Sequence, residues 1–361
     1  MIANISHDLI RRGHELNLFL VGSPTDHDYE VDPACQIFWR RDVRASARAA
    51  IPALARHLRA KRYDILLSAM PAFNNAAVIA RLIARVPTKC VLTERTNPDA
   101  DYQGERSWKR RMWHKSASLL YPKADARIAV SKGLADALAN FARLSPSSID
   151  VVYNPAYHPR TLEEEPPSRQ LHPWLNDGIG PVVIAAGRLV IQKDFGTLLR
   201  AIKLARSAIP GRLIIFGDGP LRQELSDEIA RLELGGVVAM PGFVRDIRPS
   251  LTEARYFVLS SAWEGFGNVI VEALGCGCSI VSTDCPNGPS EILDYGRYGQ
   301  LVAVGDHEGM AKAIIQMIAA PSVSEHQIAR ASEFSVAAAT SQYEAIFRRV
   351  LLNKTRRERG M

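Results

Sequence analysis

Short apolar runs alternate with segments of helical periodicity along most of the 361-residue chain. In the first half, strand-like runs lie at residues 16–21, 64–69, 89–93, 126–130 and 149–153. In the second half, they lie at residues 182–186, 212–216, 237–240, 256–259, 279–282 and 301–304. Strands that alternate with helices form parallel sheets with helices on both faces, so the pattern predicts an α/β fold with doubly wound sheets.

The two alternating sets are separated by residues 161–173, TLEEEPPSRQLHP, an acidic stretch rich in proline. This composition is typical of a linker. We therefore predict two doubly wound domains, at residues 1–160 and 174–333, that face each other across a cleft. Each is large enough for its own hydrophobic core.

The stretch at residues 263–291 carries the densest pattern of candidate chemistry. Glu264 and Glu272 stand eight residues apart around a turn that contains Gly265 and Gly267. At about 100° per residue, eight residues return almost to the same face of a helix. If a helix begins near Gly267, both carboxylates can face one cleft.

The start of that helix is also a candidate anion site. Gly265 and Gly267 have no side chains to cover the amides of Asn268 and Val269. Free amides and the positive end of a helix dipole bind anions, typically phosphate. The pattern indicates a phosphate cradle beside two carboxylates that suit sugar hydroxyls. The alternative is an ordinary helix start with two solvated acids.

Residues 181–193, PVVIAAGRLVIQK, place two cations after an apolar strand. In open α/β sheets, ligands bind at the carboxyl ends of strands. Arg188 and Lys193 would then lie near the same mouth and could offset the two charges of a departing diphosphate. Taken singly, each could equally be a solvated surface charge.

Further motifs follow in a fixed order along the chain. In the second half these are Gly187-Arg188, Lys193, Phe216-Gly217-Asp218-Gly219-Pro220, Gly242-Phe243, Glu264-Gly265-Phe266-Gly267-Asn268 and Glu272. In the first half they are Arg12-Gly13-His14-Glu15, Ala124-Asp125, Ser131 and Val152-Tyr153-Asn154-Pro155. This order and spacing resemble retaining glycosyltransferase family 4, including its members that build surface polysaccharide and lipopolysaccharide.

The resemblance implies a GT-B fold of two Rossmann-like domains. It assigns residues 1–160 to acceptor binding and residues 174–333 to the nucleotide sugar, and it implies that a helix at residues 334–353 returns to the first domain. Similar proteins begin with an apolar strand and a Gly-rich loop, whereas Met1 already lies within the helix that follows. We expect either that the true start lies upstream or that the acceptor domain is defective.

The implied reaction transfers a sugar, with retention, from a nucleotide diphosphate to a glycan or lipid-linked acceptor. Arg188, Lys193 and the amides of Asn268 and Val269 would stabilise the leaving diphosphate, so the layout requires neither metal nor cofactor. We name no general base, because the leaving phosphate is thought to take the acceptor proton in such enzymes.

The remaining implied contacts surround the donor. Glu264 would bind the donor-sugar hydroxyls, with close backbone contacts from Gly265, Phe266 and Gly267, while Glu272 would accept hydrogen bonds from the ribose and Phe243 and Val244 would border the base. The variant Cys285-Pro286-Asn287-Gly288-Pro289-Ser290-Glu291 resembles that of many uridine-diphosphate-sugar transferases. It favours a UDP-sugar over GDP-mannose.

A loop of the first half departs from the usual family pattern. Many relatives carry a histidine after the strand at residues 89–93, whereas this chain reads Thr93-Glu94-Arg95-Thr96-Asn97-Pro98. Arg95 would face the cleft as a cation near the sugar or phosphate, and Glu94 would orient it. The alternative is a surface loop in which Asn97 caps a helix.

The net charge of +7 lies entirely in residues 1–170, which hold 25 Lys and Arg against 18 Asp and Glu, since the rest of the chain holds 20 of each. Several of these positive charges lie in residues 106–123, which form a predicted amphipathic helix. The apolar stripe consists of Trp108, Met112 and Leu119, with Trp113 and Leu120 alongside, and the opposite face carries Lys109, Arg110 and Arg111. The helix either packs on its own domain or lies on an anionic membrane surface.

No signature of a nucleic-acid reader accompanies this charge, so we expect no nucleic-acid partner. No apolar run approaches the roughly 20 residues that cross a bilayer, and the first residues lack a signal-peptide core. Five cysteines without a Cys-x-x-Cys pair indicate reduced thiols. We expect a cytoplasmic protein, with peripheral association at the inner face of the plasma membrane if residues 106–123 bind lipid.

Three other functions remain open on the sequence. Gly217-Asp218-Gly219 after a strand is reminiscent of a nicotinamide-dependent oxidoreductase, but Arg222 stands where the third glycine belongs. A nucleotide-sugar epimerase or phosphorylase would share the fold. A protein that binds a nucleotide sugar without transferring it is the third.

Overall fold

The computed structural model describes residues 2–21, 32–40, 46–98, 107–157 and 171–358. The chain forms two compact units. Unit 1 comprises Met1–Pro155 and Val336–Met361, and unit 2 comprises Ala156–Ser335. Most of the predicted linker, residues 161–170, lies outside the described residues.

Unit 1 contains two parallel sheets. The larger has the order β3-β4-β5-β6, and the smaller pairs β1 with β2. The strands are β1 (Asn17–Val21), β2 (Gln36–Arg40), β3 (Ile65–Ala69), β4 (Lys89–Glu94), β5 (Ala126–Ala129) and β6 (Asp150–Val151). The helices are α1 (Ile2–Arg11), α2 (Ala47–Ala60), α3 (Pro71–Ala84), α5 (Trp108–Lys115), α6 (Ala117–Leu120), α7 (Lys132–Ala142) and α15 (Val336–Glu358). The sequence pattern predicted all of these strands except β2.

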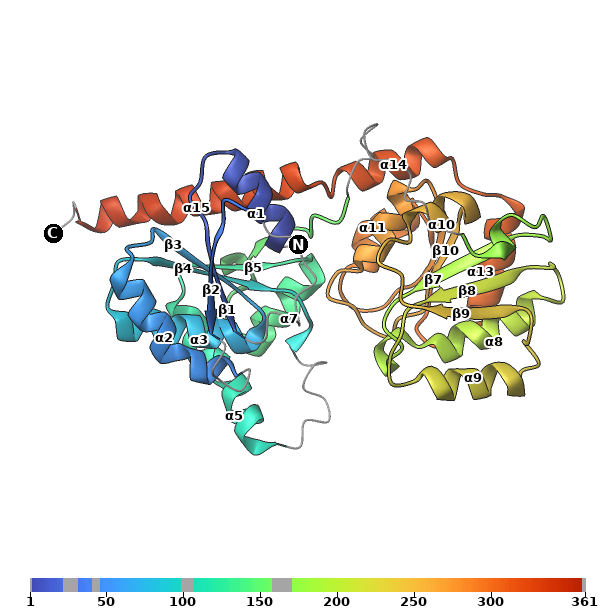
Figure 1. Cartoon of the computed structure of the whole chain (residues 1–361), viewed down its shortest axis with the longest axis horizontal. Coiled ribbons are helices and arrows are strands. Elements are labelled where there is room, and N and C mark those ends of the chain that lie inside the picture. Colours follow the sequence, from blue (N-terminus) through green and yellow to red (C-terminus); the bar gives the residue numbers. More distant parts are fainter. Residues whose placement is uncertain (1, 22–31, 41–45, 99–106, 158–170, 359–361) are drawn as a thin grey trace. The chain divides into compact units, whose positions relative to one another are not determined.

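Helices cover the larger sheet on two sides (Figure 1). On one side, α1 and α15 lie together, and Tyr343 of α15 is completely buried among Ile5, Val91 and Ile128. On the other, α2 packs against α3 through Leu58 and its neighbours. This burial of apolar side chains is the main stabilising term for the unit.

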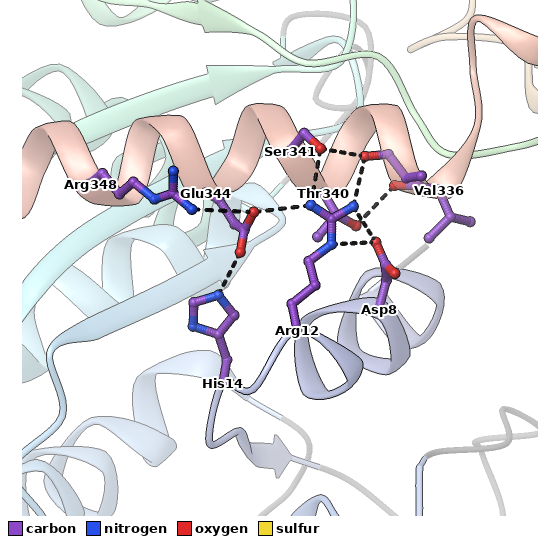
Figure 2. Close-up of polar contacts among 9 residues, drawn as sticks. Asp8, Arg12, His14, Val336, Thr340, Ser341, Glu344 and Arg348 are labelled. Atoms are coloured by element: carbon purple, nitrogen blue, oxygen red, sulfur yellow. Dashed lines mark hydrogen bonds and ion pairs between the residues drawn. The ribbon is translucent and has the colours of Figure 1, made fainter.

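A polar cluster joins α15 to the end of α1 (Figure 2). Glu344 accepts hydrogen bonds from Arg12 Nη1 at 3.0 Å and from His14 Nε2 at 2.8 Å. Arg12, which directly follows α1, also donates hydrogen bonds to Asp8 in the last part of that helix and to the carbonyl of Ala337. The hydrogen bonds that Glu344 accepts from His14 and Arg12 lower the pKa of its carboxyl below the ordinary value. We call Asp8, Arg12, His14, Ser341 and Glu344 the α1–α15 clasp.

Unit 2 is built on one six-stranded parallel sheet with the order β12-β11-β10-β7-β8-β9. Its strands are β7 (Val182–Ala186), β8 (Arg212–Phe216), β9 (Val238–Gly242), β10 (Tyr256–Leu259), β11 (Ser279–Thr283) and β12 (Gln300–Val302). Its helices are α8 (Phe195–Ala205), α9 (Arg222–Arg231), α10 (Arg248–Ala254), α11 (Asn268–Gly275), α12 (Pro289–Ile292), α13 (His307–Ala319) and α14 (Ser324–Ser332). Every residue of β7, β8 and β11 is buried, which is typical of strands covered on both faces.

Residues 107–123 form a broken helical segment instead of one helix. After α5 and α6 comes a 3₁₀ helix, Tyr121–Lys123. The break lies at Ser116, where the carbonyl of Trp113 accepts hydrogen bonds from Ser116 Oγ and from Asn75 Nδ2 at 2.7 Å. These side chains compete with the helical backbone bond. Throughout the described ranges, we find no helix with the length and apolar character that a membrane span needs.

Candidate functional site

The loops that carry the predicted site in unit 2 follow neighbouring strands. Strands β11, β10, β7 and β8 lie side by side and run parallel. The loops after them therefore emerge at the same edge of the sheet, which is where ligands bind in α/β folds. These loops contain Lys193, Glu264 and the residues around Gly217 and Gly288.

Two close approaches hold these loops together. A Cβ at Gly217 would lie 1.9 Å from the carbonyl oxygen of Gly187, and one at Gly288 would lie 2.0 Å from that of Phe266. Both positions have positive φ, 140° and 108°. Only glycine allows these approaches and conformations together, so any larger side chain would push the loops apart.

Lys193 and Glu264 form the central contact of the site. Lys193 Nζ lies 2.5 Å from Glu264 Oε1, and their side chains are only 16% and 8% exposed. Ser261, which is completely buried, donates a second hydrogen bond from Oγ to the same oxygen at 2.7 Å. The side chain predicted to bind phosphate, Lys193, and the one predicted to bind the sugar, Glu264, are therefore bonded to each other.

The backbone around this pair is fixed by hydrogen bonds between the loops. Gln192 Nε2 donates to the carbonyl of Trp263 at 2.9 Å, and the Ala262 amide donates to the carbonyl of Gln192 at 2.8 Å. Ser260 Oγ donates to the carbonyl of Lys193 at 2.8 Å. Ser260, Ser261 and Gln192 could not be predicted from the sequence, because no spacing rule distinguishes them from other polar loop residues.

Gly267 directly precedes α11, at the predicted anion site. It is the N-cap residue, its φ is 102°, and it has no side chain to bond the first amides of the helix. Asn268 is exposed at the first turn, and Val269 follows it half-buried. Phe266 is buried against Phe334, with ring centroids 5.6 Å apart, and its backbone lies directly against Gly288.

Glu272 lies within α11 and has different neighbours from Glu264. Burial raises the pKa of the Glu272 carboxyl, the positive charge of Arg248 lowers it, and Asp246 raises it. Glu264 precedes the helix, so its position comes from the loop contacts and not from helical spacing. The shared helical face that eight-residue spacing predicted is therefore not what places the two acids.

The remaining predicted residues of unit 2 lie at the surface of the same edge. Arg188 is exposed on the loop after β7. Phe243 directly follows β9 and is 75% exposed, with Val244 half-buried beside it. A hydrogen bond from the Gly217 amide to the Gly242 carbonyl, 2.9 Å long, ties this loop to the one after β8.

Arg95 follows β4 in unit 1. The neighbouring Glu94 is 1% exposed and accepts hydrogen bonds from Tyr121 Oη at 2.7 Å and from the Arg95 amide at 3.4 Å. Asn74 Nδ2 lies 3.0 Å from the carbonyl of Thr93 and 3.2 Å from Tyr121 Oη. Glu94 thus holds the backbone of the loop that carries Arg95.

The broken segment α5–α6 leaves an apolar groove in unit 1. Its volume is about 650 Å³, and Trp113, Leu120 and Ile79 line it together with more exposed side chains. Trp108, Met112 and Leu119 are 69%, 61% and 72% exposed. The guanidinium of Arg48 stacks 4.6 Å from the Trp113 ring. The segment therefore packs on its own unit through its buried residues while three large apolar side chains stay at the surface.

Two family models match the chain. The model described as "Glycosyl transferase 4-like domain" matches residues 1–155, and "Glycosyl transferases group 1" matches residues 180–320. Together they cover unit 1 as far as α15, and most of unit 2.

Curated relatives include enzymes of glycan assembly. The chain is 31% identical to the Campylobacter jejuni N-acetylgalactosamine-N,N'-diacetylbacillosaminyl-diphospho-undecaprenol 4-alpha-N-acetylgalactosaminyltransferase, over 68% of this chain and 64% of that protein. It is 37% identical to the lipopolysaccharide core biosynthesis glycosyltransferase LpsE of Rhizobium meliloti, over 45% and 48%. The chain therefore spans about half to two thirds of the length of these relatives.

Solved structures share the fold. The lipopolysaccharide outer core galactosyltransferase WaaB superposes with a TM-score of 0.72 at 19% identity, over 98% of this chain and 94% of that one. Anabaena HepE, in complex with UDP and glucose, superposes with a TM-score of 0.70 at 21% identity, over 92% and 99%. The two Rossmann-like units are those of a GT-B fold, and the chain belongs to glycosyltransferase family 4.

Proposed function

We propose that this protein transfers a sugar, with retention, from a nucleoside diphosphate sugar to a glycan or lipid-linked acceptor in the assembly of cell-surface polysaccharide. One observation carries the proposal. Lys193, Glu264 and Ser261 form a bonded group on the loops after β7 and β10, beside the Gly267 end of α11. A cation, a carboxylate and a helix N-terminus together suit a sugar diphosphate.

The protein contributes electrostatic stabilisation of the leaving group. Arg188 and Lys193 supply two positive charges, and the amides of Asn268 and Val269 add the helix dipole. These groups match the two charges of a departing diphosphate, so we propose that the reaction needs no divalent metal. Such fixed charges act most strongly as negative charge develops in the transition state.

The other assigned residues bind the rest of the donor. Glu264, with backbone groups of Gly265, Phe266 and Gly267, holds the sugar hydroxyls. Glu272 accepts hydrogen bonds from the ribose hydroxyls, and burial strengthens such bonds because the local dielectric is low. The exposed ring of Phe243, with Val244, borders the base.

A UDP-sugar is the proposed donor. The Cys285–Glu291 motif favours it, and a structure of the same fold holds UDP and glucose. The acceptor is proposed from the relatives, one of which is named for a diphospho-undecaprenol substrate and the other for the lipopolysaccharide core. Arg95 is assigned to the sugar or phosphate, with Glu94 holding its loop.

A lipid-linked acceptor requires access to a membrane surface. Trp108, Met112 and Leu119 are exposed beside the basic run Lys109-Arg110-Arg111. Exposed aromatic and aliphatic side chains with adjacent cations bind anionic interfaces. We propose peripheral attachment to the inner face of the plasma membrane through this segment.

A thermal-shift screen against UDP, GDP, ADP and CDP tests the donor assignment. A nucleotide at 100 times its dissociation constant stabilises the folded protein by about 2.7 kcal/mol, and UDP should give the largest shift. Mass spectrometry of glycosylated products from UDP-sugars and lipid extract then tests transfer. Absence of a shift with every nucleotide would contradict the proposal, and phosphate-dependent release of sugar would identify a phosphorylase instead.

A further inference from the structure

The Lys193–Glu264 ion pair joins two side chains that the donor needs for different purposes. Lys193 is assigned to the diphosphate and Glu264 to the sugar hydroxyls. In the structure, the Nζ and Oε1 atoms are 2.5 Å apart and both side chains are largely buried. A carboxylate this close to the ammonium neutralises most of its field, so the pair attracts a diphosphate less than Lys193 alone would.

We propose that the donor opens this ion pair: the diphosphate draws Lys193 away from Glu264, and the sugar hydroxyls take its place on the carboxylate. The inference rests on the proposed function and adds a coupling between the two halves of donor recognition. A nucleoside diphosphate without a sugar must break the ion pair with nothing to replace Lys193 on Glu264. A nucleotide sugar replaces the lost bond with hydrogen bonds from its hydroxyls.

The path of the lysine side chain supports this movement. A Cβ at Gly187 would lie 3.0 Å from Lys193 Cε and 3.2 Å from its Cδ, so the chain passes directly over the Gly187 backbone. Gly187 belongs to the loop that also carries Arg188. A rotation of the terminal bonds of Lys193 therefore moves its ammonium along the phosphate-binding loop while the backbone stays fixed by Ser260.

Ser261 keeps the carboxylate in place during the exchange. Its hydroxyl donates to the same Oε1 atom as Lys193, and its own carbonyl accepts a hydrogen bond from Thr283 Oγ1 at 2.6 Å. Glu264 therefore retains one buried hydrogen bond when the lysine leaves. Ser261 is a positioning residue, because it acts on the sugar through Glu264.

The exchange also accounts for release of the product. Once the sugar has been transferred, its hydroxyls no longer hold Glu264, and the carboxylate competes again for Lys193. Because Glu264 and the diphosphate compete for the same ammonium, the protein binds the remaining nucleoside diphosphate more weakly. The protein thus binds the donor more tightly than the product at the same phosphate site.

Calorimetric titration with UDP tests the proposal directly. Glu264→Gln removes the competing charge, so it should bind UDP at least fivefold more tightly than the parent while transferring sugar much more slowly. Glu228→Gln is the matched control, since it removes an acid of the same unit that pairs with Arg231 on the surface of α9, and it should leave both quantities unchanged. Lys193→Gln in addition to Glu264→Gln should abolish the gain.

A folded Glu264→Gln variant that binds UDP equally or more weakly than the parent would overturn the exchange. If the parent binds no nucleoside diphosphate at all, the proposed function fails and the exchange with it. Should Glu264→Gln unfold, Glu264→Asp gives the same test, because the shorter side chain withdraws its charge from Nζ.

Ser261 has its own readout. Ser261→Ala should lower kcat about tenfold with UDP affinity unchanged, and Ser261→Thr should restore kcat because it keeps the hydroxyl. Loss of UDP affinity in Ser261→Ala, or no recovery in Ser261→Thr, would show that Ser261 only packs the loop.

Discussion

At the scale of single residues, the site depends on which atoms share a partner. Lys193 and Ser261 both bond Glu264 Oε1, and the sequence indicated only that Lys193 and Glu264 belong to one cleft. Motif order could predict the residue types because phosphate and hydroxyl chemistry requires them. It could not predict the ion pair, since that depends on how two loops 71 positions apart in the chain meet.

Lys193→Ala should lower turnover more than it raises the donor Michaelis constant. The lysine charge matters most when the diphosphate departs, whereas part of its attraction for the donor is offset on binding, because its ion pair with Glu264 must open first. Steady-state kinetics with the donor varied will separate the two parameters. Unchanged turnover with a higher Michaelis constant would make Lys193 a binding residue only.

Glu272→Gln should weaken donor binding while it stabilises the fold at neutral pH. The lost charge-assisted hydrogen bonds are worth about 1.5 to 3 kcal/mol each, so we expect roughly a 10- to 100-fold loss of affinity. Burial raises the pKa of this carboxyl in the folded state, which therefore favours the protonated form. Folding stability of the parent accordingly falls as pH rises from the unfolded-state pKa through the folded-state pKa.

The glutamine variant lacks this pH-dependent cost, so its melting temperature should exceed that of the parent by an amount that grows with pH across this range. Melting curves between pH 4 and 8, with calorimetric titration of UDP, test both parts. A variant that binds UDP as well as the parent does would remove Glu272 from the ribose site, and one that melts below the parent at every pH would contradict the cost of burying its charge.

At the scale of elements, the sequence predicted strands best where they are buried on both faces. The expected run 256–259 coincides with β10, and 182–186 and 212–216 coincide with β7 and β8. Uninterrupted apolar runs are unambiguous when flanked by turn residues. Strand β2 was missed because QIFWR has a polar residue at each end and only three apolar residues between them, and it pairs only with β1.

The predicted helix over residues 106–123 was wrong in its continuity for a reason outside its own sequence. Asn75, which comes from α3, bonds the carbonyl of Trp113 and the hydroxyl of Ser116. Helical periodicity depends only on the residues of the helix itself, so it carries no signal from Asn75. The expected apolar stripe is therefore divided between two helices. Trp108, Met112 and Leu119 are exposed, and Trp113 is half-buried.

The α1–α15 clasp should contribute stability that disappears in acid. Hydrogen bonds from His14 and Arg12 lower the pKa of Glu344, whose side chain is 12% exposed. A carboxylate with a lowered folded-state pKa stabilises the fold above its unfolded-state pKa, and the contribution is lost as pH falls through the folded-state value. Glu344→Gln should cost about 1 kcal/mol at pH 7 and progressively less below about pH 4.

Urea unfolding of the parent and Glu344→Gln at pH 7 and at acid pH measures this difference. Asp136→Asn, an exposed acid on α7 of the same unit, is the matched control and should change little at either pH. An equal loss for Glu344→Gln at both pH values would show that its carboxylate charge does not act through the clasp.

At the scale of the whole molecule, unit 1 is made of two segments that are not consecutive in the sequence. Helix α15 follows unit 2 in the sequence and yet buries Tyr343 in the core of unit 1. No periodicity within α15 names its partner, so only the family resemblance led us to expect this return. The buried ring and the polar clasp together explain why the helix packs on α1.

The uneven charge of the molecule should direct it to anionic lipid. Lys109→Gln, Arg110→Gln and Arg111→Gln together remove three positive charges next to exposed Trp108 and Met112. Each such charge is worth about 1 kcal/mol at an anionic surface, so the triple variant should bind vesicles roughly 100-fold more weakly. Sedimentation with vesicles of phosphatidylglycerol and phosphatidylcholine measures the affinity.

The location of the charge is tested by a variant with the same net charge. Arg206→Gln, Arg297→Gln and Lys312→Gln remove three exposed cations from unit 2, and this protein should bind vesicles as the parent does. A higher salt concentration should lower the vesicle affinity of the parent toward that of the first triple variant, because exposed charges are screened within about 8 Å at physiological ionic strength. If both triple variants lose affinity equally, net charge alone drives binding; if neither does, the α5–α6 segment is not the membrane contact.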